Sequence, residues 1–545
     1  MNRKIIVIAA LLFIAIPSDA CTNLLVGKSA SKDGSTMVTY SADSYTQYGT
    51  LYHYPAAKYA PGVMLDVYDW ETDQYLGQIP QAAETYNVVG NMNEHQLCIG
   101  ETTFGGRHEL ADSTGLIEYG SLIYIALQRS KTAREAIRIM TDLVETYGYC
   151  SEGESFSIVD KNEVWIMEMI GKGIGNRGAV WVAVRIPDDC IAAHANQSRI
   201  HQFPLNDKEN CLYSKDVISF ARKMGYYKGP DKDFSFSKAY NPLDWGGLRF
   251  CEARVWSFYN RYTDNAQQWL PYILGEDPKP MPLYVKPNRQ LSVKDLMDMM
   301  RDHYEGAVFD PTKDLGAGPF HSPYRFNPLS FEVDGKKYGF ERPISTQQTG
   351  FVFAGQMRSS LPDEVGGVLW FGVDDARFTI FTPMYGCMTE TPECYRVGVG
   401  DFTHFSWKSA FWVHNWVANM AYARYDQMIV DVQLLQDKLE NDYLAAQPAI
   451  EQQAMAFSDR EKTVAYLTDY SVNTAQAALD EWKHLGEYLV VKYMDGAVKK
   501  EENGKFLKNP YGGPLYPNRP KMDEKYLREI VRQTGNRLEE KEIKQ

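Results

Sequence analysis

The segment IPSDACTNLLVGKSASKDGSTMVTYSADS (residues 16–44) joins the end of an apolar leader to two runs of strand-forming residues, and Cys21 stands at the junction. Upstream, a basic start and the short apolar run of residues 5–16 are followed by a proline and by small residues just before Cys21. This pattern is typical of a cleaved signal peptide. We therefore predict a signal peptide over residues 1–20, an exported protein that is periplasmic or extracellular, and Cys21 as its first residue after cleavage.

Downstream of Cys21 the chain alternates between strand and helix patterns. Residues 21 to about 200 contain strand-forming runs separated by turn residues, with one helical stretch at 121–148. Strand patterns return at 345–400, and helical spacing then dominates to about residue 496. This order predicts an α+β fold with antiparallel sheets. The boundaries that we predict are residues 21–425 for one domain, 426–500 for a helical extension packed on it, and 501–545 for a polar C-terminal tail.

The composition is that of a globular enzyme, and it limits the classes of partner. Hydrophobic residues make up 44% of the chain and charged residues 23%, enough for a sizeable core. The formal net charge of −13 and the lack of a basic stripe argue against a nucleic-acid partner. Beyond the leader, no apolar run reaches the roughly 18 residues that a membrane span needs. Nothing in the sequence indicates the oligomeric state.

Motifs for metals and dinucleotides are absent or out of context. The sequence has no C-x-x-C and no H-E-x-x-H motif. GIGNRG (173–178) has dinucleotide spacing, but a strand pattern follows it where a helix would have to bind the pyrophosphate. These motifs therefore support neither a zinc site nor dinucleotide binding. Cys387 and Cys394 are close enough in sequence for us to predict a disulfide across a small loop.

Cleavage before Cys21 would place two reactive groups on one residue. The freed α-amine has a reference pKa of about 7.7 to 8.0, so near neutral pH part of it is an unprotonated base. The thiol is the nucleophilic partner. One residue could then supply both nucleophile and general base, as in N-terminal threonine hydrolases. Before cleavage the nitrogen is an amide and accepts no proton, so the precursor should be inactive.

Two other fates of Cys21 stay open on the residues alone. Cys21 could be acylated as a lipid anchor, although Ser18 stands where such sites normally have an aliphatic residue. It could instead form a disulfide with one of the other cysteines. The anchor and the nucleophile exclude each other, because acylation of the amine would remove the base.

The segment CTNLLVGKSASKDGSTMVTYSADS resembles the start of the N-terminal-nucleophile cysteine dipeptidases, the family of dipeptidase D-type enzymes and secernins. The resemblance continues through NEHQLCIGETTFGGR, ESFSIVDKNEVWIMEMIG, ANQSRI, RDHYEG and GGVLWFGVDDARFTIFTPMY, and covers most of residues 21 to about 425 in order. It implies a four-layered αββα N-terminal-nucleophile hydrolase sandwich with Cys21 as nucleophile. It also implies hydrolysis of dipeptides or short peptides without metal or organic cofactor.

The resemblance implies roles for further residues. Asp43 matches the acidic position that orients the nucleophile's amine, and Asn196 matches the asparagine expected near the oxyanion. Thr103 could donate a hydrogen bond to the oxyanion or the amine, and Glu101 lies in the same segment as a substrate-binding candidate. Arg254 could hold a substrate carboxylate bidentately, or it could be a surface or structural arginine.

The chain departs from the family pattern just before Asp43. Members often have Arg-Asn-Glu-Asp where this chain has YSAD, so that Tyr40 replaces an arginine. An arginine beside the thiol would lower its pKa, whereas a tyrosine hydroxyl donates a hydrogen bond and carries no charge.

Three hypotheses for the function follow. The leading one is an exported cysteine dipeptidase that forms a thioester on Cys21, with the α-amine as general base. The second is a related amide hydrolase acting on penicillin V or bile salts. The third is a lipid-anchored protein without catalytic activity.

Overall fold

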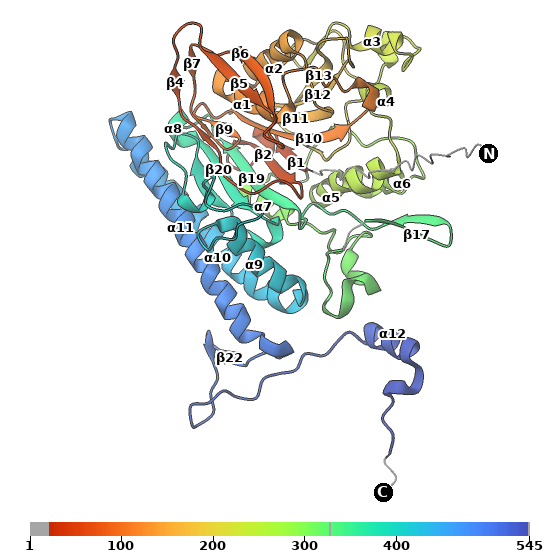
Figure 1. The fold of residues 1–545 in the computed structure, drawn as a ribbon, viewed down its shortest axis with the longest axis vertical. Coiled ribbons are helices and arrows are strands. Elements are labelled where there is room, and N and C mark those ends of the chain that lie inside the picture. Colours follow the sequence, from red (N-terminus) through yellow and green to blue (C-terminus); the bar gives the residue numbers. More distant parts are fainter. Residues whose placement is uncertain (1–20, 326–328, 543–545) are drawn as a thin grey trace, which may run out of the picture.

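The computed structural model describes residues 21–325 and 329–542. The predicted signal peptide, residues 1–20, lies outside them. Within the described ranges, long helices accompany large antiparallel sheets, which confirms the α+β class (Figure 1).

The strands that follow Cys21 form the centre of the first large sheet. β1 (Asn23–Val26) pairs antiparallel with β2 (Thr36–Asp43). An isolated bridge between Thr22 and Ser41 extends this pairing almost to Cys21. The nucleophile candidate is therefore anchored at one end of a central strand.

Two large antiparallel sheets are present in the described residues. The first has the order β16 (Tyr284–Val285), β14 (Ile191–His194), β1, β2, β19 (Thr349–Met357), β20 (Gly367–Val373) and β21 (Thr382–Tyr385). The second has the order β15 (Cys211–Tyr213), β13 (Ala179–Ile186), β12 (Val164–Gly171), β11 (Gly153–Val159), β10 (Cys98–Gly105), β9 (Met92–Asn93), β8 (Val88–Val89) and β3 (His53–Tyr54).

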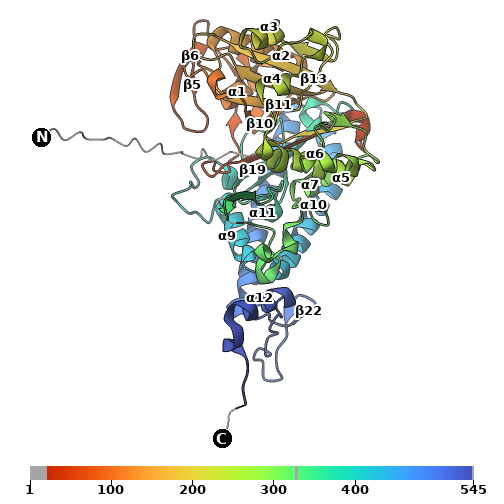
Figure 2. The ribbon, with the colours of Figure 1, turned by 90° about the vertical axis from the view of Figure 1, so that its right-hand side faces the viewer.

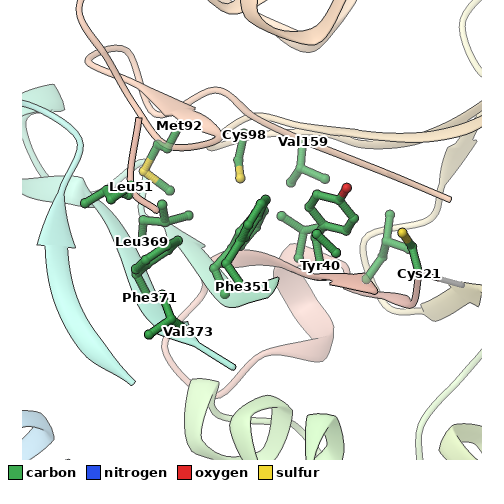
Figure 3. Packing of buried hydrophobic residues seen from close by; sticks show 14 of the residues in the cluster. Cys21, Tyr40, Leu51, Met92, Cys98, Val159, Phe351, Leu369, Phe371 and Val373 are labelled. Carbon is green, nitrogen blue, oxygen red and sulfur yellow. The ribbon is translucent and has the colours of Figure 1, made fainter. Parts of the chain in front are cut away.

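The inner faces of these sheets pack against each other. Val38 and Tyr40 of β2 belong to the same buried cluster as Cys98 and Val159 of the second sheet, and Figure 3 shows part of this core. Met37 belongs instead to a cluster on the opposite face of β2. Because both faces of β2 are covered, the strand carries apolar residues on both of them.

Helices cover the outer faces of both sheets. α5 (Ala253–Tyr262) and α7 (Val293–Met300) pack on the first sheet, and α1 (Tyr119–Arg129) and α2 (Ala133–Tyr147) pack on the second. The order across the molecule is therefore helices, sheet, sheet and helices (Figures 1 and 2).

The single helix predicted at 121–148 is wrong in one respect, because the structure divides it into α1 and α2. Ser130 is extended, and the Thr132 hydroxyl accepts a hydrogen bond from the backbone N–H of Glu135. The Glu135 carboxylate in turn accepts from the Lys131 N–H (2.8 Å). The S-K-T-x-x-E sequence is a capping signal that starts a new helix, and it went unrecognised within an apolar pattern that continues across it.

Three long helices follow the last strand of the first sheet. They are α9 (Ala410–Tyr422), α10 (Tyr425–Met455) and α11 (Arg460–Lys492), and they pack on β20 and β21. The remaining helices are α3 (Val217–Lys223), α4 (Phe236–Tyr240), α6 (Leu270–Ile273), α8 (Asp363–Gly366) and α12 (Glu524–Thr534). The small hairpins are β4–β7 (Ala57–Lys58, Glu84–Thr85), β5–β6 (Met64–Tyr68, Tyr75–Pro80), β17–β18 (Ser330–Val333, Lys336–Gly339) and β22–β23 (Glu501–Glu502, Lys505–Phe506).

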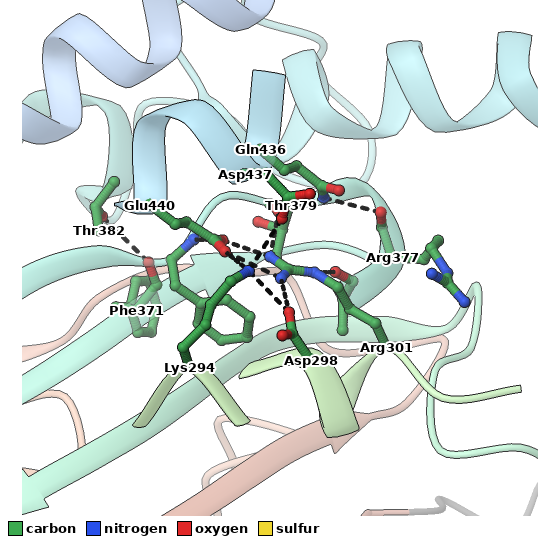
Figure 4. A network of polar contacts seen from close by, with 12 residues as sticks. Lys294, Asp298, Arg301, Phe371, Arg377, Thr379, Thr382, Gln436, Asp437 and Glu440 are labelled. Carbon is green, nitrogen blue, oxygen red and sulfur yellow. Dashed lines mark hydrogen bonds and ion pairs between the residues drawn. The ribbon is translucent and has the colours of Figure 1, made fainter. Parts of the chain in front are cut away.

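A buried ionic network joins α10 to the rest of the fold (Figure 4). Glu440 of α10 accepts two hydrogen bonds from Arg301, at 3.0 and 2.5 Å, and one from Lys294 at 2.8 Å. The Phe381 N–H also donates to Glu440 (3.0 Å). The Glu440 side chain is fully buried, so the network fixes α10 on the sheet rather than leaving it as a separate appendage.

Glu440→Gln is expected to lower the free energy of unfolding by about 3 kcal/mol or more, because it removes the buried counter-ion of Arg301 and leaves only the half-exposed Asp298 (3.3 Å) beside it. Urea denaturation measures this change. Asp437→Asn is the matched control, since Asp437 contacts the same Lys294 (3.2 Å) but is exposed, and it should cost less than about 1 kcal/mol. Equal losses in the two variants would show that the network contributes no more than a surface ion pair.

The predicted disulfide between Cys387 and Cys394 is not formed. Both side chains are buried in different apolar clusters, which separates two thiols that lie near each other in sequence.

Across the described ranges, no helix combines the length and the apolar character that a membrane crossing requires. α12 buries none of its residues, and the C-terminal segment that carries it lies away from both large sheets in Figures 1 and 2.

Candidate active site

Cys21 is enclosed where the two sheets meet. Only 6% of the residue is exposed, and its Sγ lies 3.6 Å from Glu101 Oε1, at the distance of a weak S–H hydrogen bond. Its main-chain carbonyl accepts a hydrogen bond from Arg254 Nη1 (2.6 Å). The structure therefore brings two of the residues singled out in the sequence, Glu101 and Arg254, into contact with Cys21.

Arg254 holds several main-chain segments at once. Nη1 donates to the Cys21 carbonyl and to the Thr22 hydroxyl (2.8 Å), and Nη2 donates to the Ala195 carbonyl (3.1 Å) and to Asn196 Oδ1 (2.9 Å). Nε donates to a carbonyl of its own helical turn (2.7 Å). These contacts use the five N–H groups of the guanidinium. The predicted bidentate contact with a substrate carboxylate is therefore replaced by a positioning role.

The helix that carries Arg254 begins in an unusual way. A π-helical turn, Gly247–Glu252, runs directly into α5. Such turns occur frequently at functional sites. Glu252 at its end forms a buried ion pair with Arg199 (2.8 Å), which fixes the turn against the segment that carries Asn196.

Arg254→Lys is expected to lower the free energy of unfolding by about 3 kcal/mol and kcat/KM for peptide hydrolysis by at least about 10-fold. Lysine keeps the charge but cannot make the forked set of hydrogen bonds, so buried carbonyls at Cys21 and Ala195 lose their donors. Denaturant unfolding and steady-state kinetics measure the two effects. Arg249→Lys is the control, because Arg249 lies in the adjacent turn, is partly exposed and pairs with Glu341 (3.0 Å). A change of the same size at Arg249 would contradict the positioning role.

Asn196 lies just after β14 and has a positive φ of 62°, which asparagine tolerates better than most residues. Its Nδ2 donates to the Thr103 carbonyl (2.7 Å), and its Oδ1 is held by Arg254. The Thr103 hydroxyl donates to Glu154 Oε1 (2.8 Å). The amide of Asn196 is thus fixed between β10 and α5, on the same arginine as the Cys21 carbonyl.

Asp43 ends β2 and is fully buried. Its carboxylate accepts from Arg342 Nη2 (2.7 Å), from the Thr349 hydroxyl (2.7 Å) and from the Ser41 hydroxyl (3.1 Å). Ser41, two residues before Asp43 on β2, pairs with Thr22, the residue that follows Cys21. The predicted role of Asp43 in orienting the α-amine stays a prediction.

Glu101 is held against Cys21 from two strands. The Tyr40 hydroxyl donates to Glu101 Oε1 (2.5 Å), so the tyrosine that replaces the family arginine contacts this carboxylate. In the amide orientation that satisfies its neighbours, Asn23 donates to the Glu101 carbonyl (2.9 Å) and accepts from the Glu101 N–H (3.1 Å). A Cβ at Gly100 would lie 2.8 Å from the end of the Asn23 side-chain amide and 3.1 Å from Tyr40 Cβ, so glycine at this position favours the close approach of β10 to β1 and β2.

A second buried carboxyl group faces Glu101. In the β10–β11 register Glu101 lies opposite Phe156, and Thr103 lies opposite Glu154. Glu101 and Glu154 are therefore diagonal neighbours on one face of the sheet. Burial raises the pKa of both carboxyl groups, and for Glu154 the neighbouring Glu101 raises it further. Two carboxylates so close together cannot both ionise readily, so the pair retains a proton.

Sequence reasoning missed several groups around this pair. Tyr119 at the start of α1 donates to Glu71 (2.5 Å), and Glu71 acts electrostatically on both Glu101 and Glu154. The two ring nitrogens of His194 form hydrogen bonds with the hydroxyls of Thr102 and Ser157 (2.7 Å each). Burial and Arg199 lower the pKa of His194 to about 3, so its ring is neutral.

The available signals for these residues were weak. Glu154 is the second residue of β11 and His194 the last residue of β14, and a charged or polar residue in a buried strand indicates a buried partner. That signal locates neither the partner nor the site.

Within residues 21–325 and 329–542, no three His, Cys, Asp or Glu side chains are grouped so that they could hold a metal ion.

Curated relatives of this chain carry dipeptidase names. A probable dipeptidase of Latilactobacillus sakei is 28% identical over 481 residues, which cover 83% of this chain and 91% of the relative. A probable dipeptidase of Salmonella dublin is 26% identical over 386 residues, covering 67% and 81%. Probable dipeptidase B of Lactococcus lactis subsp. lactis is 25% identical over 505 residues, covering 87% and 95%.

The model of peptidase family C69 matches residues 20–51 and 47–438. These segments contain Cys21 and all the site residues described above, and they extend into α10. The resemblance seen in the sequence is thereby confirmed. The chain belongs to peptidase family C69, the cysteine dipeptidase family, and is a cysteine-type peptidase.

Proposed function

We propose that this chain is an exported cysteine dipeptidase whose mature form begins at Cys21. The observation that carries the proposal is the environment of this residue. Its Sγ contacts Glu101, and its carbonyl is held by the same buried arginine that holds Asn196. The family match that begins at residue 20 supports Cys21 as the first catalytic residue, and the names of the relatives support dipeptides as substrates.

The proposed reaction is acyl transfer through a thioester. The α-amine of Cys21 accepts the thiol proton, and sulfur attacks the scissile carbonyl carbon. Asn196 and backbone N–H groups stabilise the oxyanion of the tetrahedral intermediate. The intermediate collapses to a thioester as the leaving amine takes the proton from the Cys21 ammonium group. Water then attacks the thioester through the same sequence of proton transfers, which releases the acid and restores the thiol.

The architecture supports this mechanism. Two antiparallel sheets between helical layers are the arrangement that the αββα N-terminal-nucleophile sandwich would have, with the nucleophile at the end of a central strand. The leader pattern before Cys21 supports export to a periplasmic or extracellular compartment, with its removal as the activating step.

A substrate panel tests the proposed function. The processed protein is incubated with dipeptides of varied side chains, with tripeptides, with penicillin V and with conjugated bile salts. The dipeptidase proposal requires the highest kcat/KM on dipeptides. Faster cleavage of penicillin V or bile salts would favour the related amide hydrolase, and a diacylated Cys21 in the mass spectrum together with no hydrolysis would favour the lipid-anchored protein.

A further inference from the structure

The carboxyl pair beside Cys21 has unused hydrogen-bonding capacity. Glu101 and Glu154 are each 1% exposed, and among the described residues no group outside the pair donates to the Oε2 atom of either side chain. Leaving buried carboxylate oxygens without donors is costly. The pair is therefore placed to accept hydrogen bonds from a group that enters the site with the substrate.

The chemistry of a dipeptide determines which group that is. When Sγ attacks the first carbonyl carbon, the α-nitrogen of the same substrate residue is two bonds from that carbon. Standard bond lengths put this nitrogen within about 4 Å of Sγ. Glu101 Oε1 is itself 3.6 Å from Sγ, so the substrate nitrogen and this carboxylate oxygen both lie within about 4 Å of the same sulfur atom. A free N-terminus brings an ammonium group there, with three N–H donors and a positive charge.

We propose that the Glu101–Glu154 pair binds the α-ammonium group of the first substrate residue and makes the enzyme selective for peptides with a free N-terminus. This inference rests on the proposed dipeptidase function and names the residues that define its substrate class. Glu101 receives the ammonium directly, next to the thiol. Glu154 shares the remaining proton with Glu101 and is held by the Thr103 hydroxyl.

The surrounding groups fit a cation rather than an anion. The side chains that act on the pair are the hydroxyls of Tyr40 and Thr103, the thiol of Cys21 and the carboxylate of Glu71, and none of them adds positive charge. The burial that disfavours a lone carboxylate strengthens its attraction for an ammonium ion. Arg254, which carries a positive charge, is turned toward main-chain carbonyls and Asn196.

A matched pair of substrates tests the inference on the unaltered enzyme. Alanyl-leucine and propionyl-leucine differ only in the α-ammonium group, and both contain the same scissile bond. The wild-type enzyme is expected to prefer alanyl-leucine by at least about 100-fold in kcat/KM, because buried carboxylates left unpaired strongly disfavour the analogue. Equal kcat/KM on the two substrates would overturn the inference while leaving the dipeptidase function intact. Failure to cleave any dipeptide would overturn the proposed function itself.

Glu101→Gln assigns the effect to the pair. The variant is expected to lose far more activity on alanyl-leucine than on propionyl-leucine, so that the preference falls by at least about 10-fold. Equal losses on both substrates would instead mean that Glu101 serves the Cys21 amine, and would overturn the inference. Glu118→Gln is the control, since Glu118 is also a buried carboxyl group but caps α1, and it should keep the preference. If Glu101→Gln does not fold, the wild-type comparison still decides.

Discussion

Cys21→Ala is expected to abolish dipeptide hydrolysis, with kcat reduced by at least about 10³-fold. Removing the nucleophile of an acyl-transfer enzyme can cost on the order of 10⁶ in kcat, and what remains comes from binding and oxyanion stabilisation. Alanine keeps the α-amine and the carbonyl that Arg254 holds, so the fold and the base are left in place. Rates of dipeptide hydrolysis by the processed wild type and variant give the ratio.

A second cysteine variant serves as the control for this loss. Cys150 is half-buried and lies in the loop between α2 and β11, at a distance in sequence from Cys21. Cys150→Ala should retain at least about half of the activity. Should Cys21→Ala keep more than about a tenth of the wild-type rate, the nucleophile must be another residue.

Retaining a single residue before Cys21 is expected to lower kcat by about 10² to 10⁴. A form that begins at Ala20 has a peptide nitrogen at Cys21, and this nitrogen cannot accept the thiol proton. The thiol, the Glu101 contact and the Arg254 contacts would all remain. The measurement compares the form that begins at Ala20 with the form that begins at Cys21, after mass spectrometry has established both N-termini.

The comparison between these two forms isolates the base from the nucleophile. Thiol alkylation checks that Cys21 is present and reactive in both, and thermal unfolding checks that both are folded. Full activity of the form that begins at Ala20 would refute the α-amine as general base, and a nearby carboxylate such as Glu101 would then have to take the proton.

The sequence predicted the parts of this protein whose signals are local. Strand runs and the helices after residue 400 depend on periodicity and turn residues within a short window. The strand after GIGNRG was also predicted correctly, because β13 begins at Ala179. The break between α1 and α2 was missed since an apolar period continued across the capping signal.

The site was predictable only where one residue carries the chemistry. Cys21 was found because the leader pattern and the reactive thiol meet at a single position. Glu101 was found through the resemblance, yet its contact with Tyr40 was not, because the two residues lie on different sheets. Arg254 was assigned to a substrate carboxylate, whereas packing directs its guanidinium to the carbonyl of Cys21.

By itself, the sequence determined the α+β class and the family of this protein, and it predicted Cys21 as the nucleophile. Only the tertiary structure decided which groups surround Cys21, because Glu101, Glu154 and Arg254 come from distant segments on β10, β11 and α5. The physical reason is that local periodicity records which face of an element is buried, whereas the pairing of buried charges depends on how sheets and helices stack. The selectivity that we infer for the N-terminus depends on that stacking.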